Sequence, residues 1–81
     1  MRYFFHIRDS EGLLRDEEGS ELPDMEAARR EARLSARDLA VDDLRAGRPV
    51  IHRRIEITDA AGTVLGLVPV RDVVDGAERR L

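Results

Sequence analysis

The sequence predicts an α+β domain of two layers, with a mostly antiparallel four-stranded sheet and one long helix on one face of the sheet. Three observations favour this β-β-α-β-β order. The N-terminal segment alternates with period two, and the middle of the chain repeats small and apolar residues at helical spacing. A turn of the form Asp-x-x-Gly also occurs on each side of the helical region, at residues 9–12 and 59–62. The 81 residues are enough for a single small domain.

The first strand is predicted at residues 2–8, where the sequence RYFFHIR places large side chains on both faces. This segment holds all three aromatic residues of the chain. After the turn, a short return strand begins at residue 13. It ends in the charged stretch 16–20, because three adjacent carboxylates and a glycine pair poorly in a sheet.

One helix of about 22 residues, roughly 33 Å long, is predicted between Asp24 and Gly47. Asp24 is a favourable N-cap, and Gly47 followed by Pro49 is a typical helix end. The predicted buried stripe is Met25, Ala28, Ala32, Ser35, Leu39 and Ala46, with Ala36 beside it. Most of these side chains are small, so we expect the helix to lie close to the sheet.

The core should join the first strand to this helix. Phe5 and Leu39 each lie on the more apolar face of their element, so we expect them to face each other. Truncation of either to alanine is expected to cost about 2–5 kcal/mol.

A second hairpin is predicted after the helix, with strands at residues 51–58 and 63–70. Residues 71–75 are expected to form one helical turn. Residues 1–75 then make up one domain, and residues 76–81 are predicted to be a flexible polar tail.

Composition excludes several classes of protein. The chain has no cysteine, so it has no disulfide, no thiolate metal site and no thiol nucleophile, which fits a reducing cytoplasm. No apolar run approaches the roughly 18–20 residues of a membrane span, and no signal sequence is recognisable. We therefore predict a cytoplasmic protein without membrane contact. The net charge of −3 argues against a chain that coats nucleic acid.

Several segments resemble a family of short bacterial proteins classed as a domain of unknown function. The resemblance covers nearly the whole chain and implies a hairpin-helix-hairpin fold without an established activity. A weaker likeness is to the N-terminal domain of HicB-type antitoxins, which also begin with an aromatic strand and place a helix of small residues over a sheet. The segments that resemble the family are RYFFHIRD at 2–9, GSELPDMEAA at 19–28, ITDAAGTVL at 57–65 and VPVRDVV at 68–74.

Catalytic and metal-binding patterns are missing. The two histidines, His6 and His52, lack the spacing of a zinc site, and His6 is expected to be a structural residue held by hydrogen bonds. The acidic pairs at 17–18 and 42–43 have divergent side chains, unlike the convergent oxygens that calcium requires. No glycine-rich phosphate loop occurs. We predict no enzymatic activity, no metal and no cofactor.

Three arginines form a stripe along the helix. Arg29, Arg33 and Arg37 are four residues apart, and like charges at this spacing repel. Either the eight acids of residues 9–26 or a nucleic-acid phosphate would compensate them. We favour the acids, because surrounding carboxylates would also repel phosphates, and so nucleic-acid binding is not expected. The alternatives differ in whether this candidate anion-binding stripe is open or covered.

The face of the sheet without a helix is the predicted interaction surface. A single helix covers one side of a sheet, yet both the first and the last strand carry apolar side chains on both sides. We expect a two-fold homodimer to bury this second face. The candidate interaction residues are Phe4, His6, Leu65 and Leu67.

A row on the helix offers an alternative contact, with Ala27, Leu34 and Val41 at seven-residue spacing. We rank it below the sheet face because its side chains are smaller. The predicted function is a small non-enzymatic interaction module that forms a homodimer and binds a further, unknown protein. The alternative is an antitoxin-like or nucleic-acid-binding regulator that uses the arginine stripe.

Overall fold

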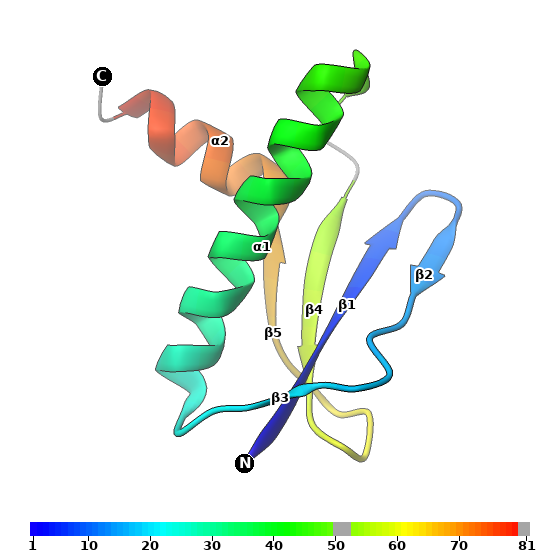
Figure 1. Cartoon of the computed structure of the whole chain (residues 1–81), viewed down its shortest axis with the longest axis vertical. Helices are drawn as coiled ribbons and strands as arrows, with labels where there is room; N and C mark the ends of the chain where they lie inside the picture. Colours follow the sequence, from blue (N-terminus) through cyan, green and yellow to red (C-terminus); the bar gives the residue numbers. More distant parts are fainter. Residues whose placement is uncertain (50–52, 80–81) are drawn as a thin grey trace.

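A computed structural model describes residues 1–49 and 53–79, with side chains as far as residue 74. One long helix lies against one face of an open antiparallel sheet, which confirms the predicted α+β class (Figure 1). The elements are β1 (Arg2–Asp9), β2 (Gly12–Leu14), β3 (Ser20–Glu21), α1 (Met25–Ala46), β4 (Arg54–Thr58), β5 (Val64–Pro69) and α2 (Val70–Arg79).

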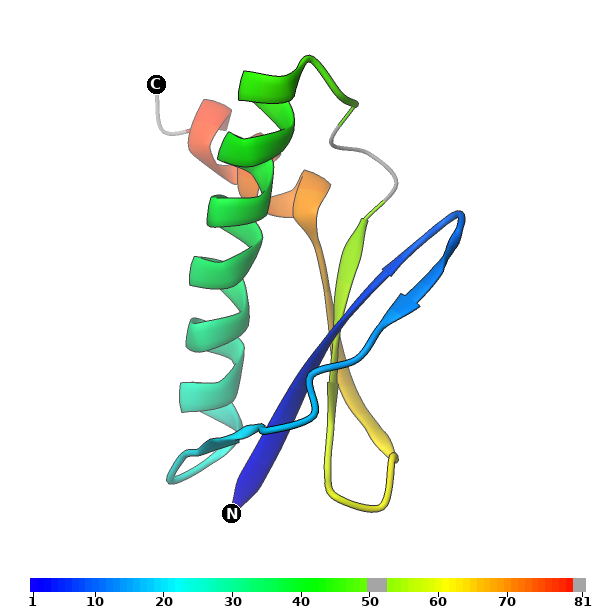
Figure 2. The ribbon, with the colours of Figure 1, turned by 45° about the vertical axis from the view of Figure 1, so that its right-hand side comes forward.

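The sheet has five strands instead of the expected four. Its order is β2-β1-β4-β5, and β3 pairs with the N-terminal end of β1. Strand β1 therefore borders β4 on one edge, and β2 and β3 on the other. The β1–β2 hairpin leans away from α1 (Figure 2). The predicted start of the second hairpin at residue 51, and His52, lie outside the described residues.

Helix α1 begins and ends where its capping residues predict. The Asp24 carboxylate accepts a hydrogen bond from the Ala27 N–H at 2.8 Å, and Gly47 is left-handed, with its N–H directed at the carbonyls of Asp43 and Leu44. Of the predicted stripe, Ala46 is exposed, because the last turn of α1 extends beyond the strands (Figure 1).

The core forms between the alanine row of α1 and the sheet. Alanine at every fourth position from residue 28 to residue 40 keeps the middle of the buried face free of long side chains, so the helix backbone approaches the strands closely there. The large core side chains come from the strands and from the start of α2. The buried core residues are Tyr3, Ala28, Ala32, Ala36, Ala40, Ile55, Ile57 and Val70.

Phe5 and Leu39 both pack against this core, and both line the same hollow between the sheet and α1. Each is only half-buried. We therefore expect Phe5→Ala and Leu39→Ala to lower the free energy of unfolding by about 2 kcal/mol, the low end of the range for core truncations. Urea denaturation of each variant measures this. An unchanged denaturation midpoint for Phe5→Ala would contradict the packing of this face.

The predicted face of the last strand is wrong at Leu65. The pairing of β4 with β5 contains a bulge, so that Thr58 lies opposite Val64 and Leu65 is one residue too many. Leu65 packs against the core, whereas Leu67 is 54% exposed. An extra residue shifts the alternation of side chains beyond it, so Leu65 and Leu67 do not share a face.

The C-terminal segment is more helical than predicted. In place of one turn followed by a tail from Gly76, α2 continues for ten residues to Arg79. Its first turns place Val70, Val73 and Val74 against the core. Tertiary packing of this apolar face outweighs the low helix propensity of Gly76. Residues 80–81 lie outside the described part.

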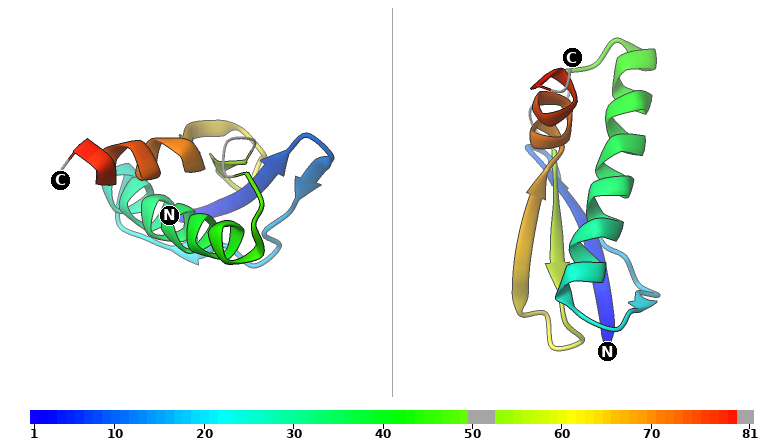
Figure 3. Two further views of the ribbon diagram at one scale, coloured as in Figure 1. Left: turned by 90° about the horizontal axis from the view of Figure 1, so that it is seen from above. Right: turned by 90° about the vertical axis from the view of Figure 1, so that its left-hand side faces the viewer.

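Seen from the side, α1 lies on one side of the sheet, and α2 continues from the end of β5 and packs against α1 (Figure 3). Neither helix, over the residues described, is long and apolar enough to cross a membrane. The opposite side of the strands has no helix over it, and the candidate site lies there.

Candidate interaction surface

The side of the sheet opposite α1 presents a regular array of side chains. In antiparallel strands, directly opposed residues point to the same face. The residues opposite one another on β1, β4 and β5 therefore form three rows on this side. We call these nine residues the open face: Phe4, Thr58 and Val64; His6, Glu56 and Leu67; Arg8, Arg54 and Pro69.

The centre of the open face is densely covered although no helix lies over it. Glu56 and Thr58 of β4 are only 7% and 3% exposed. The Nε atoms of Arg8 and Arg54 both bind Oε2 of Glu56, the second at 3.4 Å. The hydrogen bond from Arg8 lowers the pKa of Glu56. Burial raises this pKa, but the positive charges of Arg8 and Arg54 lower it further, so the net pKa is below its ordinary value. Two guanidinium groups thus share one carboxylate, which leaves this end of the face positive.

His6 is held at both ring nitrogens. The Asp16 backbone N–H donates to Nδ1 at 3.0 Å, so the neutral ring carries its proton on Nε2. Nε2 lies 3.1 Å from Oγ1 of Thr58 and donates to it. The ring also stacks on Phe4, with centroids 6.3 Å apart and planes at 14°. His6 therefore has the hydrogen bonds that a structural histidine was expected to have.

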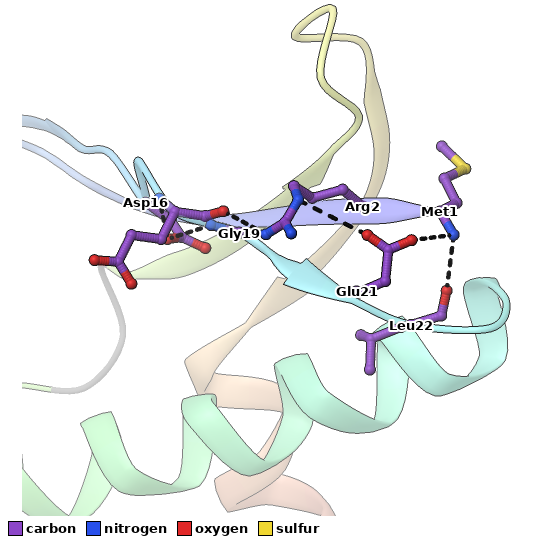
Figure 4. A network of polar contacts seen from close by, with 7 residues as sticks. Met1, Arg2, Asp16, Gly19, Glu21 and Leu22 are labelled. Carbon is purple, nitrogen blue, oxygen red and sulfur yellow. Dashed lines mark hydrogen bonds and ion pairs between the residues drawn. The ribbon is translucent and has the colours of Figure 1, made fainter.

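Asp16 holds the loop that runs along β1 between its pairing with β2 and its pairing with β3. Its Oδ2 accepts the Phe5 N–H at 3.2 Å, and its Oδ1 accepts the N–H groups of Glu18 and Gly19 at 3.3 and 3.1 Å. The contact with Gly19 is part of the network that continues to β3 (Figure 4). Between β2 and β3, the Asp16 carboxylate accepts a backbone N–H of β1 as a neighbouring strand would. The sequence does not indicate this role of Asp16, because the role depends on how the loop folds back along β1.

These contacts make stability depend on pH. Partial burial raises the pKa of Asp16, but the N–H groups of Gly19, Phe5 and Glu18, with the His6 ring, lower it more, so the net pKa lies below the ordinary 3.8. A carboxylate with a lowered folded-state pKa stabilises the fold fully above its unfolded-state pKa. This stabilisation is lost as the pH falls through the folded-state value.

We therefore expect the free energy of unfolding to decrease between about pH 5 and pH 2. Asp16→Asn should be less stable than the wild type at pH 7 and should show a flatter decrease. Urea titrations at several pH values measure both. Since the pKa of Glu56 is also lowered, part of the decrease should persist in this variant. Identical pH profiles would contradict the role of Asp16.

The open face has a hollow at the end opposite Arg8 and Arg54. Its volume is about 280 Å³, and Phe4, His6 and Thr58 contribute to its lining. Three carboxylates and one guanidinium also line it, so this end is acidic. The other lining residues are Arg15, Asp16, Glu17, Asp59, Ala60 and Gly62.

Three of the four predicted interaction residues lie on the open face. Phe4 and His6 are half-buried, and Leu67 is exposed. Leu65 does not belong to the face. Val64 takes its place and is 52% exposed. Nothing in the sequence indicates Val64, because the bulge that exposes it depends on the pairing of β4 with β5.

The arginine stripe is open, contrary to the expected screening by the acidic loop. Arg29, Arg33 and Arg37 are exposed, and none forms an ion pair with any side chain that the structure describes.

Two of these acids bind elsewhere: the Asp16 carboxylate accepts the Phe5 N–H of β1, and Glu21 binds the N-terminus. The Glu21 carboxylate binds the Met1 ammonium group at 2.8 Å (Figure 4). The hydrogen bond from this group and its positive charge lower the pKa of Glu21, although slight burial acts in the opposite direction.

The positions of the stripe and the acids on the helix explain this difference. Glu31 and Asp38 line a hollow of about 300 Å³ beside Phe5 of β1, so the acidic flank of α1 faces the β1 side. Successive helix residues rotate by about 100°, which places Arg33 on the opposite flank. The loop next to β1 therefore lies on the far side of α1 from the stripe.

Metal binding has no support in the arrangement of side chains. No group of three or more histidine, aspartate or glutamate side chains in the described segments comes close enough together to hold an ion. Both nitrogens of His6 already have partners, so its ring has no free nitrogen for a ligand.

Comparison with known proteins places the chain in one family. No curated protein and no solved structure matches it. The likeness to antitoxins stays a prediction. A family model described as "Domain of unknown function (DUF6894)" matches residues 2–71. That range runs from the start of β1 into α2 and so includes the whole open face. The chain therefore belongs to the DUF6894 family, in agreement with the resemblance found in its sequence.

Proposed function

We propose that this domain is a non-enzymatic protein interaction module and that the open face is its docking surface. One observation carries the proposal: a sheet face without a helix exposes Val64 and Leu67 by more than half, next to the stacked rings of Phe4 and His6. Aromatic and apolar side chains surrounded by charges are typical of protein interfaces. The proposal places the module in the cytoplasm, which a cysteine-free chain fits.

A binding role agrees with the chemistry of the face better than catalysis does. A general base needs a ring nitrogen or carboxylate that is free to take a proton. On this face, His6 is bound at both nitrogens, and Glu56 is held by two arginines. The polar groups therefore fix the shape and the charge of the surface.

The test is the loss of a partner through one substitution on this face. Leu67→Arg places a charge in the middle row of the open face, and Leu44→Arg makes the same change on the exposed side of α1. We expect a protein that co-purifies stoichiometrically from native cells, or a second copy of the chain, to be lost with Leu67→Arg and retained with Leu44→Arg. Equal retention with both variants, or the absence of any stoichiometric partner, would overturn the proposal.

A nucleic-acid-binding regulator is the second candidate, favoured by the open arginine stripe. Neutralisation of three phosphates by Arg29, Arg33 and Arg37 would give a slope of about −2.7 in log K against log salt. Fluorescence anisotropy with duplex DNA and RNA, for the wild type and the triple glutamate variant, measures this slope. The net charge of −3 opposes such binding, so we expect none at physiological salt. Binding that the triple variant abolishes would favour this candidate over the interaction module.

A further inference from the structure

The two ends of the open face carry opposite charge. At one end, Arg8 and Arg54 share the single carboxylate of Glu56, which leaves a surplus of one positive charge. At the other end, the three carboxylates around the hollow outnumber the one arginine by two. Four residues of β4 separate the two ends, which is about 13 Å at 3.3 Å per residue.

A surface with one basic and one acidic end is complementary to itself. Two copies packed face to face can be related by a two-fold axis parallel to the strands or perpendicular to them. The parallel axis places like charges together, whereas the perpendicular axis places each basic end on the acidic end of the other copy. Electrostatic complementarity of this kind fixes orientation. In a two-fold dimer, each contact also occurs twice.

From this arrangement we infer that the open face binds the open face of a second copy, with the two-fold axis perpendicular to the strands. The inference rests on the proposed function and names its partner. Leu67 and His6 of the middle row lie near the axis. The basic end of each copy reaches the acidic hollow of the other.

The acidic and aromatic lining of the hollow is suited to an arginine side chain of the other copy. The side chain of Arg8 is 40% exposed, so its guanidinium group has free N–H donors beside the one that binds Glu56. With this axis each strand lies over its counterpart in the other copy, so Arg8 of β1 reaches the ring of Phe4, beside the carboxylate of Glu17 in the hollow. A guanidinium group over an aromatic ring gains a cation–π contact in addition to the ion pair.

The size of the face predicts a weak dimer. A standard interface contains about 20–30 residues on each side, and the open face with its hollow has fewer. We therefore expect association in the micromolar range that depends on concentration and weakens at high salt.

Exchange of the two charges gives a sharp test by sedimentation velocity at micromolar concentrations. Glu17→Arg and Arg8→Glu each place like charges together, so each should weaken the dimer by about tenfold or more. Neither variant should self-associate, yet an equimolar mixture should form a heterodimer, because both ion pairs are then attractive. The double variant should dimerise like the wild type. Arg30→Glu, an exposed change on α1, is the matched control and should have no effect.

The thermal melt of each variant monitors folding. If Arg8→Glu destabilises the chain next to Glu56, Arg8→Gln replaces it and should weaken the dimer without adding a charge. A monomer at all concentrations, or a dimer insensitive to both charge changes, overturns the inference. So does a dimer lost with Leu34→Arg but kept with Leu67→Arg, which would place the contact on α1. If the chain is monomeric and Leu67→Arg still removes another protein, this inference fails and the proposed function stands.

Discussion

Asp43→Ala is expected to lower the free energy of unfolding by about 3–5 kcal/mol, because it breaks a buried ion pair on one side only. Asp43 is 1% exposed, and its Oδ1 accepts hydrogen bonds from Arg48 Nε at 3.1 Å and Arg53 Nη1 at 2.8 Å. Without the carboxylate, the largely buried guanidinium group of Arg53 has no counter-charge. Urea denaturation measures the loss.

The effect is large because Asp43 joins two parts of the fold. It lies in the last turns of α1, and its backbone carbonyl also accepts the Arg48 N–H at 2.8 Å. Arg53 directly precedes β4, and its carbonyl accepts the N–H of Val70 at the start of α2. One carboxylate thus fixes the end of the long helix to the beginning of the central strand.

Asp42→Ala is the matched control, since it removes the neighbouring, exposed carboxylate from the same helical turn. We expect it to change the free energy of unfolding by less than about 0.5 kcal/mol. Similar losses for both variants would contradict the structural role of Asp43.

The sequence contains a signal for the role of Asp43. The pair 42–43 lacks the convergent oxygens of a calcium site. Position 43 nevertheless continues the row of Ala32, Ala36 and Ala40 at helical spacing, which places it on the buried face. An aspartate on that row requires a buried partner. Arg53 as that partner was beyond prediction, because the contact depends on how the chain returns to the sheet.

Local signals predicted the elements of the fold, and long-range pairing produced the differences. Asp24 and Gly47 mark the ends of α1 because capping depends on neighbouring residues alone. Strand β3 and the bulge opposite Thr58 depend on strands far apart in sequence. The extent of α2 depends on packing against the core.

In the candidate site too, local signals predicted some positions and long-range contacts determined the others. Alternation along β1 correctly placed Phe4 and His6 on the face away from the helix. Because of the bulge, Val64 and not Leu65 lies on the open face, and the alternation of residues along the strand does not predict this. The spacing of the arginine stripe was evident, but its surroundings were not, because the path of the acidic loop is set by the contacts of Asp16 with β1.

Gly19→Ala is expected to lower the free energy of unfolding by about 2–4 kcal/mol, from backbone strain and steric overlap together. The φ angle of Gly19 is +72°, which disfavours a side chain. An added Cβ would also lie 2.9 Å from the carbonyl oxygen of Tyr3 and 2.9 Å from the ring of Phe4. Strand β1 runs through the sheet between β4 and the loop, so its backbone cannot retreat easily.

Gly47→Ala separates the two contributions, because Gly47 has nearly the same φ angle of +71° and no atom within 4 Å of an added Cβ. It should therefore lose only the cost of the left-handed backbone, about 1–2 kcal/mol. Urea denaturation of both variants gives the difference, which measures the overlap with β1. Equal losses would mean that the loop moves away freely. A larger loss for Gly19→Ala would indicate that this loop is pressed against Phe4 and helps to hold the aromatic pair on the open face.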